Sequence, residues 1–186
     1  MVKVGVVLGS TRPGRLGASV ASWVMELAAM RSDAEFELVD VDEYKLPVLD
    51  EAVPPMMGQV EHQHTKDWAA AIARYDAFVF ITAEYNRSLP GALKNAIDYV
   101  FYEWHNKAAG IVSYGAAGGV RAAENLRLVL GELKVATTRE QVLLSIHTDF
   151  ENWTVFTPSD QHVATLNTVF DEVVAWGSAL KSLRDK

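Results

Sequence analysis

Two arginines and two hydroxyl side chains lie close together near the start of the chain, in the turn Gly9-Ser10-Thr11-Arg12-Pro13-Gly14-Arg15. Guanidinium groups match the geometry of phosphate oxygens, and hydroxyl groups add further hydrogen-bond donors. The turn follows an apolar run and precedes a helical pattern, and the N–H groups at the start of a helix favour an anion. We therefore predict that this turn binds a phosphate group; the alternative is a solvated turn with surface arginines.

Two further turns combine aromatic, polar and small residues. In residues 82–91 a tyrosine stands beside amide and hydroxyl groups, which could line a ligand or, for Asn86 and Ser88, cap the next helix. In residues 113–119 three glycines allow a flat ligand or another backbone segment to approach closely. The sequence contains neither G-x-x-x-x-G-K-[ST] nor G-x-G-x-x-G, so it lacks the fingerprints of a nucleotide-hydrolysing P-loop and of a dinucleotide site.

The histidines and the acidic residues near the turns do not indicate a catalytic side chain. A metal site needs several convergent ligands, so we predict that the histidines are surface or loop residues. These histidines are His62, His64, His105, His147 and His162. Glu84 could act as an acid–base residue, but a capping or solvated role is at least as plausible. We interpret Asp40 and Asp42 as solvated charges at the end of a strand. We assign no catalytic residue and no metal site.

The elements that must position the three turns follow from the hydrophobic pattern. Strands are predicted over residues 2–8, 35–41, 76–82, 108–114 and 141–146. Helices are predicted over residues 16–31, 65–75, 120–133 and 161–183, with another that begins at Pro90-Gly91. This alternation predicts a parallel sheet covered by helices on both faces. Ligands bind beyond the carboxyl ends of such strands, so the turns after strands one, three and four should be functional.

Composition limits the function classes. The chain has 186 residues, with 17 Lys and Arg against 24 Asp and Glu, which gives a net charge of −7. This length predicts one domain over residues 1–186, and the acidic balance argues against nucleic-acid binding. The absence of cysteine excludes disulfides and thiolate chemistry. We see no membrane span and no signal peptide, so we expect no membrane partner and a cytoplasmic location.

The three turns resemble the motifs of a known family, the NADPH-dependent FMN reductases of flavodoxin-like fold. Leu8-Gly9-Ser10-Thr11-Arg12-Pro13-Gly14-Arg15 is similar to the family's phosphate loop. Glu84-Tyr85-Asn86 with Ser88, followed by residues 90–98, is similar to the second and most specific motif. Ser113-Tyr114-Gly115 with Gly118-Gly119 and Arg121-Ala122 is similar to the third. The resemblance covers residues 2 to about 144, with the motifs in the family's order.

The resemblance implies a flavodoxin-like fold, with a five-stranded parallel sheet of order 2-1-3-4-5 and helices on both faces. It implies an FMN-dependent NAD(P)H oxidoreductase that passes electrons from NADPH or NADH to a flavin, quinone, azo or metal-oxyanion acceptor. The residues that it places around FMN are Ser10, Thr11, Arg12, Arg15, Glu84, Tyr85, Asn86, Ser88, Ser113, Tyr114, Gly115 and Gly118. The chain has Ala83 where the family commonly has proline, so we expect a looser second turn.

Two other functions are compatible with the same fold. The protein could be a non-enzymatic electron carrier of the flavodoxin type, or a regulatory protein that binds FMN only structurally. The arginines of the first turn favour the reductase, because flavodoxin phosphate loops are typically rich in Ser and Thr.

The chain also predicts an assembly. The run over residues 99–104 has more aromatic residues than one helix face needs, so it could form an exposed interface patch or be a helix end buried in its own core. Family members are usually dimers or tetramers, so we favour the exposed patch and expect a homodimer or homotetramer. In the irregular insert 147–160, Phe150, Trp153 and Phe156 could cover the pocket or pack on the sheet edge.

Overall fold

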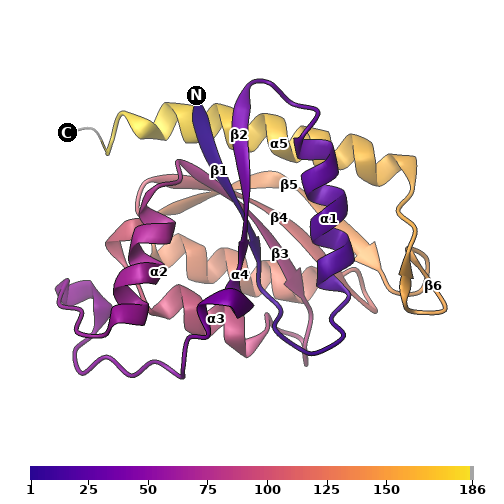
Figure 1. Ribbon diagram of the computed structural model, residues 1–186. Coiled ribbons are helices and arrows are strands. Elements are labelled where there is room, and N and C mark those ends of the chain that lie inside the picture. The colour runs from indigo at the N-terminus through magenta and orange to yellow at the C-terminus, as the bar shows by residue number, and fades with distance from the viewer. Residues whose placement is uncertain (185–186) are drawn as a thin grey trace.

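The computed structural model describes residues 1–184 and contains a parallel sheet at its centre (Figure 1). The strand order is β2-β1-β3-β4-β5, which confirms the predicted topology. The strands are β1 (Val2–Leu8), β2 (Ala34–Asp40), β3 (Ala77–Ala83), β4 (Lys107–Gly115) and β5 (Val135–Ser145). All pairings in this sheet are parallel, so the carboxyl ends of the five strands lie at one edge.

Helices cover both faces of the sheet, as predicted. On one face, α1 (Gly17–Ala28) and α5 (Asp160–Lys181) pack on side chains such as Val4, Val6 and Val79. The other face carries α2 (Gln63–Ala73), α3 (Gly91–Asp98) and α4 (Val120–Glu132), packed on Val7, Phe78 and Phe80. Alternate residues of one strand therefore enter different apolar layers, which is why the central strands read as continuous apolar runs.

The segments between these elements are more regular than predicted. Within residues 1–184, three short 3-10 helices occur: η1 (Val41–Tyr44), η2 (Pro55–Met57) and η3 (Tyr102–Trp104). The insert after β5 forms a small antiparallel hairpin of β6 (Phe150–Glu151) and β7 (Val155–Phe156). Strand β5 also begins at Val135 rather than at residue 141, and its register with β4 shifts between Ala109 and Ile111.

The aromatic run over residues 99–104 is mostly interior, so our interpretation of it as an exposed patch was wrong for most of its members. Tyr99 and Trp104 are fully buried, and their polar atoms donate hydrogen bonds within the fold. Only Tyr102 is strongly exposed, at 58%. Trp104 in η3 donates to the Ile97 carbonyl of α3 at 3.1 Å, so the run packs back against α3, which a count of aromatic residues could not reveal.

Within residues 1–184, we find no helix that combines the length and the apolar character needed to cross a membrane.

Candidate functional site

The turns after β1, β3 and β4 come together at the carboxyl edge of the sheet, as predicted. In Figure 1 the carboxyl ends of β1 and β3 point toward the lower part of the view, where the indigo turn after β1 lies. A pocket of about 270 Å³ opens between the turns, and its lining includes five predicted residues: Arg12, Glu84, Tyr85, Tyr114 and Gly115. We call it the three-turn pocket.

Four residues of this lining were missed by sequence reasoning. They are Leu16, Ala83, Ala116 and Ile146. All are apolar or small, and nothing in their type indicates chemistry. The only available signal was their position within or beside the three turns or just after the last strand.

Ser10 connects the first turn to the third. Its side chain is fully buried, and its hydroxyl oxygen lies 3.0 Å from the hydroxyl of Tyr114. Burial raises the pKa of Tyr114, so this hydroxyl stays protonated at neutral pH. A Cβ atom at Gly17 would lie 2.7 Å from both hydroxyl oxygens, so only glycine fits beside this contact. Ser10 thus has a structural partner and does not present its hydroxyl at the surface.

Arg15 forms an ion pair with Asp40, at the end of the neighbouring strand. One guanidinium nitrogen lies 2.8 Å from the carboxylate, a second contacts the other carboxylate oxygen, and Arg15 also donates to the Ser10 carbonyl. Hydrogen bonding to Asp40 raises the pKa of Arg15. Our interpretation of Asp40 as a solvated charge was wrong: its side chain is only 13% exposed. The parallel register places Asp40 opposite Leu8, directly beside the turn.

Arg12 has a different environment in the same turn. Its side chain is exposed, and its guanidinium contacts only the carbonyl oxygens of Pro13 and Gly14, at 3.2 and 3.4 Å. In the part of the chain that the structure describes, it forms no ion pair with a carboxylate. The backbone N–H groups of Thr11, Arg12 and Gly14 donate to no backbone oxygen within residues 1–184. The first turn therefore offers one uncompensated cation and several free donors, which suits an anion.

The second turn is a tight reversal at the mouth of the pocket. The N–H of Tyr85 donates to the Ser88 carbonyl at 2.9 Å, and the N–H of Ser88 donates to the Tyr85 carbonyl at 3.1 Å. Between them, Asn86 and Arg87 have positive φ angles of 49° and 69°. The turn begins directly after Ala83, which is paired with Tyr114 in the sheet.

The expected caps of the next helix by Asn86 and Ser88 are not formed. Helix α3 begins after Pro90 and has no side-chain hydrogen bond at its N-terminus.

Glu84 joins the second turn to the start of α4. Its carboxylate accepts from the guanidinium of Arg121 at 2.5 Å and from the backbone N–H of Arg121 at 3.1 Å. Its side chain is only 7% exposed, so the capping role is confirmed and the solvated role is wrong. The Nε atom of Arg121 is buried and has no acceptor among the described residues. Arg121 belongs to the third motif, but its residue type and spacing indicated no role for it.

The third turn is shaped by its own glycines. Gly118 and Gly119 have φ angles of 67° and 71°, and a Cβ atom at Gly119 would lie 2.7 Å from the backbone nitrogen of Tyr114. The Ser113 hydroxyl donates to the Gly118 carbonyl at 2.7 Å, so these two predicted site residues face each other inside the turn. The N–H of Glu84 donates to the Tyr114 carbonyl at 3.0 Å and fixes the second turn against the third.

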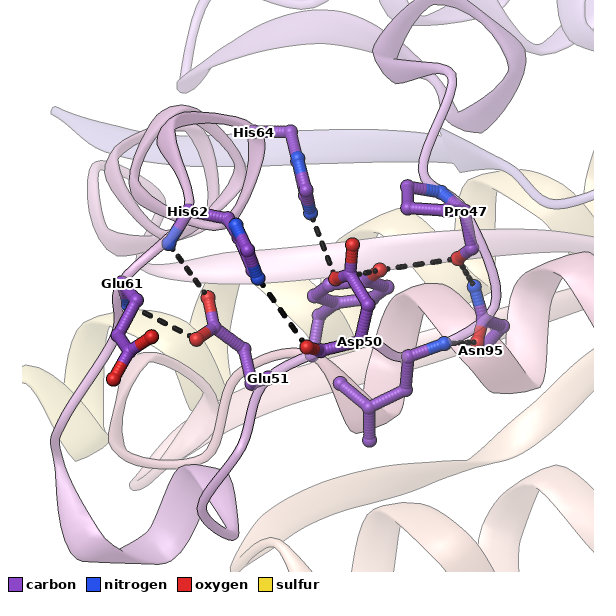
Figure 2. Close-up of polar contacts among 9 residues, drawn as sticks. Pro47, Asp50, Glu51, Glu61, His62, His64 and Asn95 are labelled. Atoms are coloured by element: carbon purple, nitrogen blue, oxygen red, sulfur yellow. Dashed lines mark hydrogen bonds and ion pairs between the residues drawn. The ribbon is translucent and has the colours of Figure 1, made fainter.

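The histidines lie outside the three-turn pocket. His62 and His64 stack with ring centroids 5.1 Å apart, and His64 lies 3.0 Å from Asp50 (Figure 2). His162 lies 2.9 Å from Asp149, beside the hairpin. Within residues 1–184, no group of three or more His, Cys, Asp or Glu side chains is arranged to hold a metal ion.

The hairpin packs against α1 and beside Tyr114, and none of its residues lines the three-turn pocket. Phe150 is buried, and Phe156 packs edge-on against Trp23 of α1 with centroids 5.5 Å apart. Trp153, at the tip, is 63% exposed.

Sequence comparisons with known proteins identify one family, and a solved structure shows the same fold. The family model described as NADPH-dependent FMN reductase matches residues 2–149. An NAD(P)H-dependent FMN reductase of Nectria sp is 39% identical over 159 residues, which cover 80% of this chain and 79% of the relative. A quinone reductase of Pseudomonas putida is 36% identical over 131 residues, 67% of each chain. The flavoenzyme NAD(P)H:(acceptor) oxidoreductase FerB of Paracoccus denitrificans shares the fold, with a TM-score of 0.74, 24% identity, and coverage of 96% of this chain and 98% of that one.

Proposed function

The chain belongs to the NADPH-dependent FMN reductase family, and we propose that the three-turn pocket is where it binds FMN. The protein is an FMN-dependent NAD(P)H oxidoreductase, with FMN as its cofactor and NAD(P)H as its electron donor. When bound, FMN supplies the redox chemistry, and the protein supplies binding, orientation and electrostatics.

Arg12 is the residue that most strongly supports a phosphate site in the first turn. Its guanidinium has no carboxylate partner in the described chain and lies in a turn with free backbone donors, at the entrance to α1. Thr11 adds a half-buried hydroxyl in the same turn. These donors fit a phosphate dianion. Arg15 and Ser10, whose polar groups already have partners, shape the turn around it.

The ring system of FMN would lie between the second and third turns. Tyr85 and the backbone around Glu84 form one side, and Gly115 with Ala116 forms the other. Helix α4 begins just after the third turn, so its N-terminal N–H groups give this side a positive potential. That potential favours negative charge on the ring, and Glu84 keeps the helix start fixed through Arg121.

The electron acceptor is a quinone in this proposal. Several relatives carry the name quinone reductase, and another is named 2-hydroxy-1,4-benzoquinone reductase. The pocket mouth offers exposed Tyr85 beside apolar Ala116 and Leu16, which suits a flat, partly apolar acceptor. We assign no acid–base side chain to the reaction.

The activity can be tested with purified protein. We expect a flavin absorption spectrum that is bleached by NADPH under anaerobic conditions and restored by a benzoquinone, with many turnovers per protein. A spectrum that NADPH does not bleach, with no turnover, would instead support an electron carrier or a regulatory FMN-binding protein.

We also propose that two copies of the chain associate. Met56, Met57 and Tyr102 are 54%, 61% and 58% exposed. The Tyr102 hydroxyl donates to the Met56 carbonyl, so these side chains belong to one patch. A largely apolar groove lined by Pro54, Pro55 and Phe101 adjoins it. A contiguous apolar patch of this kind is typical of an interface.

A further inference from the structure

A second pocket, of about 290 Å³, opens on the other side of the first turn. Thr11 forms one wall, and Val41, Asp42 and Lys45 form the opposite wall, just after β2. Ala92 and Asn95 of α3 complete the lining with Leu46. We call it the β2-edge pocket. Because β2, β1 and β3 are adjacent and parallel, it lies along the same edge of the sheet as the three-turn pocket.

The outer wall of this pocket is held firmly against α3. The side-chain oxygen of Asn95 accepts from the N–H of Leu49 at 2.9 Å, and its amide nitrogen donates to the Pro47 carbonyl at 2.6 Å (Figure 2). The Tyr99 hydroxyl lies 2.9 Å from the Asp50 carboxylate, which also contacts His64. Pro47, Leu49 and Asp50, just after the lining residues Lys45 and Leu46, are therefore held by side chains from α2, from α3 and from Tyr99, which follows α3.

The chemistry of the lining is divided between an apolar interior and a charged rim. Val41 is 4% exposed, and Ala92 and Leu46 lie beside it. At the rim, the ammonium of Lys45 lies 2.9 Å from the Asp42 carboxylate, and 72% of the Lys45 side chain is exposed. Lys45 adopts a φ of 46°, in the left-handed region, and ends η1. An apolar interior suits a nucleobase, a carboxylate suits a ribose hydroxyl, and an ammonium suits a phosphate.

The electron donor has two ends. Its nicotinamide end must reach the FMN in the three-turn pocket, so its adenosine end must lie within one dinucleotide length of that pocket. The β2-edge pocket shares the first turn with it, through Thr11 on one side and Arg12 on the other. We propose that the β2-edge pocket binds the adenosine end of NAD(P)H, with Asp42 accepting from the ribose and Lys45 pairing with the 2′-phosphate of NADPH.

This inference rests on the proposed function and adds a specificity mechanism to it. Asp42 repels a 2′-phosphate and accepts a hydrogen bond from a free ribose hydroxyl, so it favours NADH. Lys45 attracts the 2′-phosphate, so it favours NADPH. The ion pair between them sets the balance between the two donors, and each partner can be removed separately.

The test uses Lys45→Met and Asp42→Asn, with Lys66→Met, on the exposed face of α2, as the control. We measure binding of adenosine 2′,5′-bisphosphate and adenosine 5′-monophosphate to the FMN-loaded protein, and kcat/KM for NADPH and NADH. Lys45→Met should weaken bisphosphate binding by about tenfold and leave monophosphate binding unchanged. Asp42→Asn should weaken monophosphate binding and move the kcat/KM ratio toward NADPH. Lys66→Met should change neither quantity.

Two results would overturn the proposal: wild-type protein that binds neither nucleotide, or an unchanged kcat/KM ratio in both variants. FMN affinity is measured on the same samples. A wild-type protein that binds FMN and oxidises NAD(P)H keeps the proposed function even if the β2-edge pocket fails the test. A wild-type protein that does neither contradicts the proposed function itself.

Discussion

Arg12 and Arg15 lie in one turn, yet their guanidinium groups have different partners. Arg12 contacts only carbonyl oxygens of its own turn, whereas Arg15 is bound to Asp40 and to the Ser10 carbonyl. Both terminal nitrogens of Arg15 already donate to Asp40 or to the Ser10 carbonyl, and this ion pair is mostly buried, so Arg15 has few free donors for a phosphate. At the scale of single residues, Arg12 is therefore the ligand candidate and Arg15 is a positioning residue.

We predict that Arg15→Ala destabilises the protein without abolishing its preference for FMN over riboflavin. The substitution leaves the Asp40 carboxylate partly buried and unpaired, so the free energy of unfolding should fall by about 1–3 kcal/mol in urea denaturation. The double variant with Asp40→Ala should recover part of this loss. An Arg15→Ala protein of normal stability that binds FMN and riboflavin equally would make Arg15 a phosphate ligand instead.

Lys107 gives a pH prediction at the opposite edge of the sheet. Its Nζ atom is buried and donates to the carbonyls of Ile72 and Ala73, at 2.8 and 3.2 Å, where α2 ends. Burial lowers the pKa of Lys107 from 10.5 to about 7. Between these two values the unfolded chain binds more protons than the folded chain, so this residue makes stability rise with pH from about 7 to about 10.

The comparison with Lys107→Met isolates this contribution. Urea denaturation at pH 7 and pH 10 should show a larger gain for the wild type than for Lys107→Met, while Lys66→Met, an exposed substitution on α2, should follow the wild type. Parallel pH curves for all three proteins would mean that the ammonium of Lys107 is as well accommodated in the fold as in water.

At the scale of elements, the third turn depends on glycine at one position. The backbone of Gly119 is in the left-handed region, which side chains disfavour, and a Cβ atom there would lie 2.7 Å from the backbone nitrogen of Tyr114. We expect Gly119→Ala to lower the free energy of unfolding by about 2 kcal/mol or more and to weaken FMN binding. Gly131→Ala is the matched control, because open space surrounds Gly131 in α4; alanine there should raise stability by about 0.5–1 kcal/mol. Equal thermal stability of the two variants would contradict this account of the turn.

The order of the elements was predictable because buried parallel strands read as apolar runs between helical patterns. The three turns were predictable for the same reason, since they follow β1, β3 and β4. The partners inside the site were not predictable. The pair of Arg15 with Asp40 depends on strand register, and the capping of α4 by Glu84 joins residues far apart in the chain. The β6–β7 hairpin is built from two-residue strands, which are too short to show a period.

At the scale of the whole molecule, we predict a dimer that forms through the patch around Met57. Light scattering at micromolar concentration should give twice the mass of one chain. Met57→Glu should shift the protein toward the monomer, because a buried unpaired carboxylate is costly in an interface. Met30→Glu is the control: Met30 is 73% exposed and follows α1, on the opposite face of the sheet. A monomeric wild type would contradict this prediction.

The net charge of −7 opposes the binding of a phosphate group. A protein of this charge repels a phosphate dianion at long range, so local donors must overcome that repulsion. Arg12 is the uncompensated cation of the first turn. Hydrogen bonds to charged groups contribute about 1.5–3 kcal/mol, which corresponds to roughly 10- to 150-fold in affinity.

Titration of the apo-protein with FMN and with riboflavin, for the wild type and for Arg12→Ala, tests the central claim most directly. Riboflavin lacks the phosphate, so its affinity reports on the ring site alone. We predict that the wild type binds FMN more tightly than riboflavin, and that Arg12→Ala weakens FMN binding by roughly 10- to 150-fold while riboflavin binding hardly changes. Equal wild-type affinities for the two flavins would contradict the assignment of the first turn as the phosphate site.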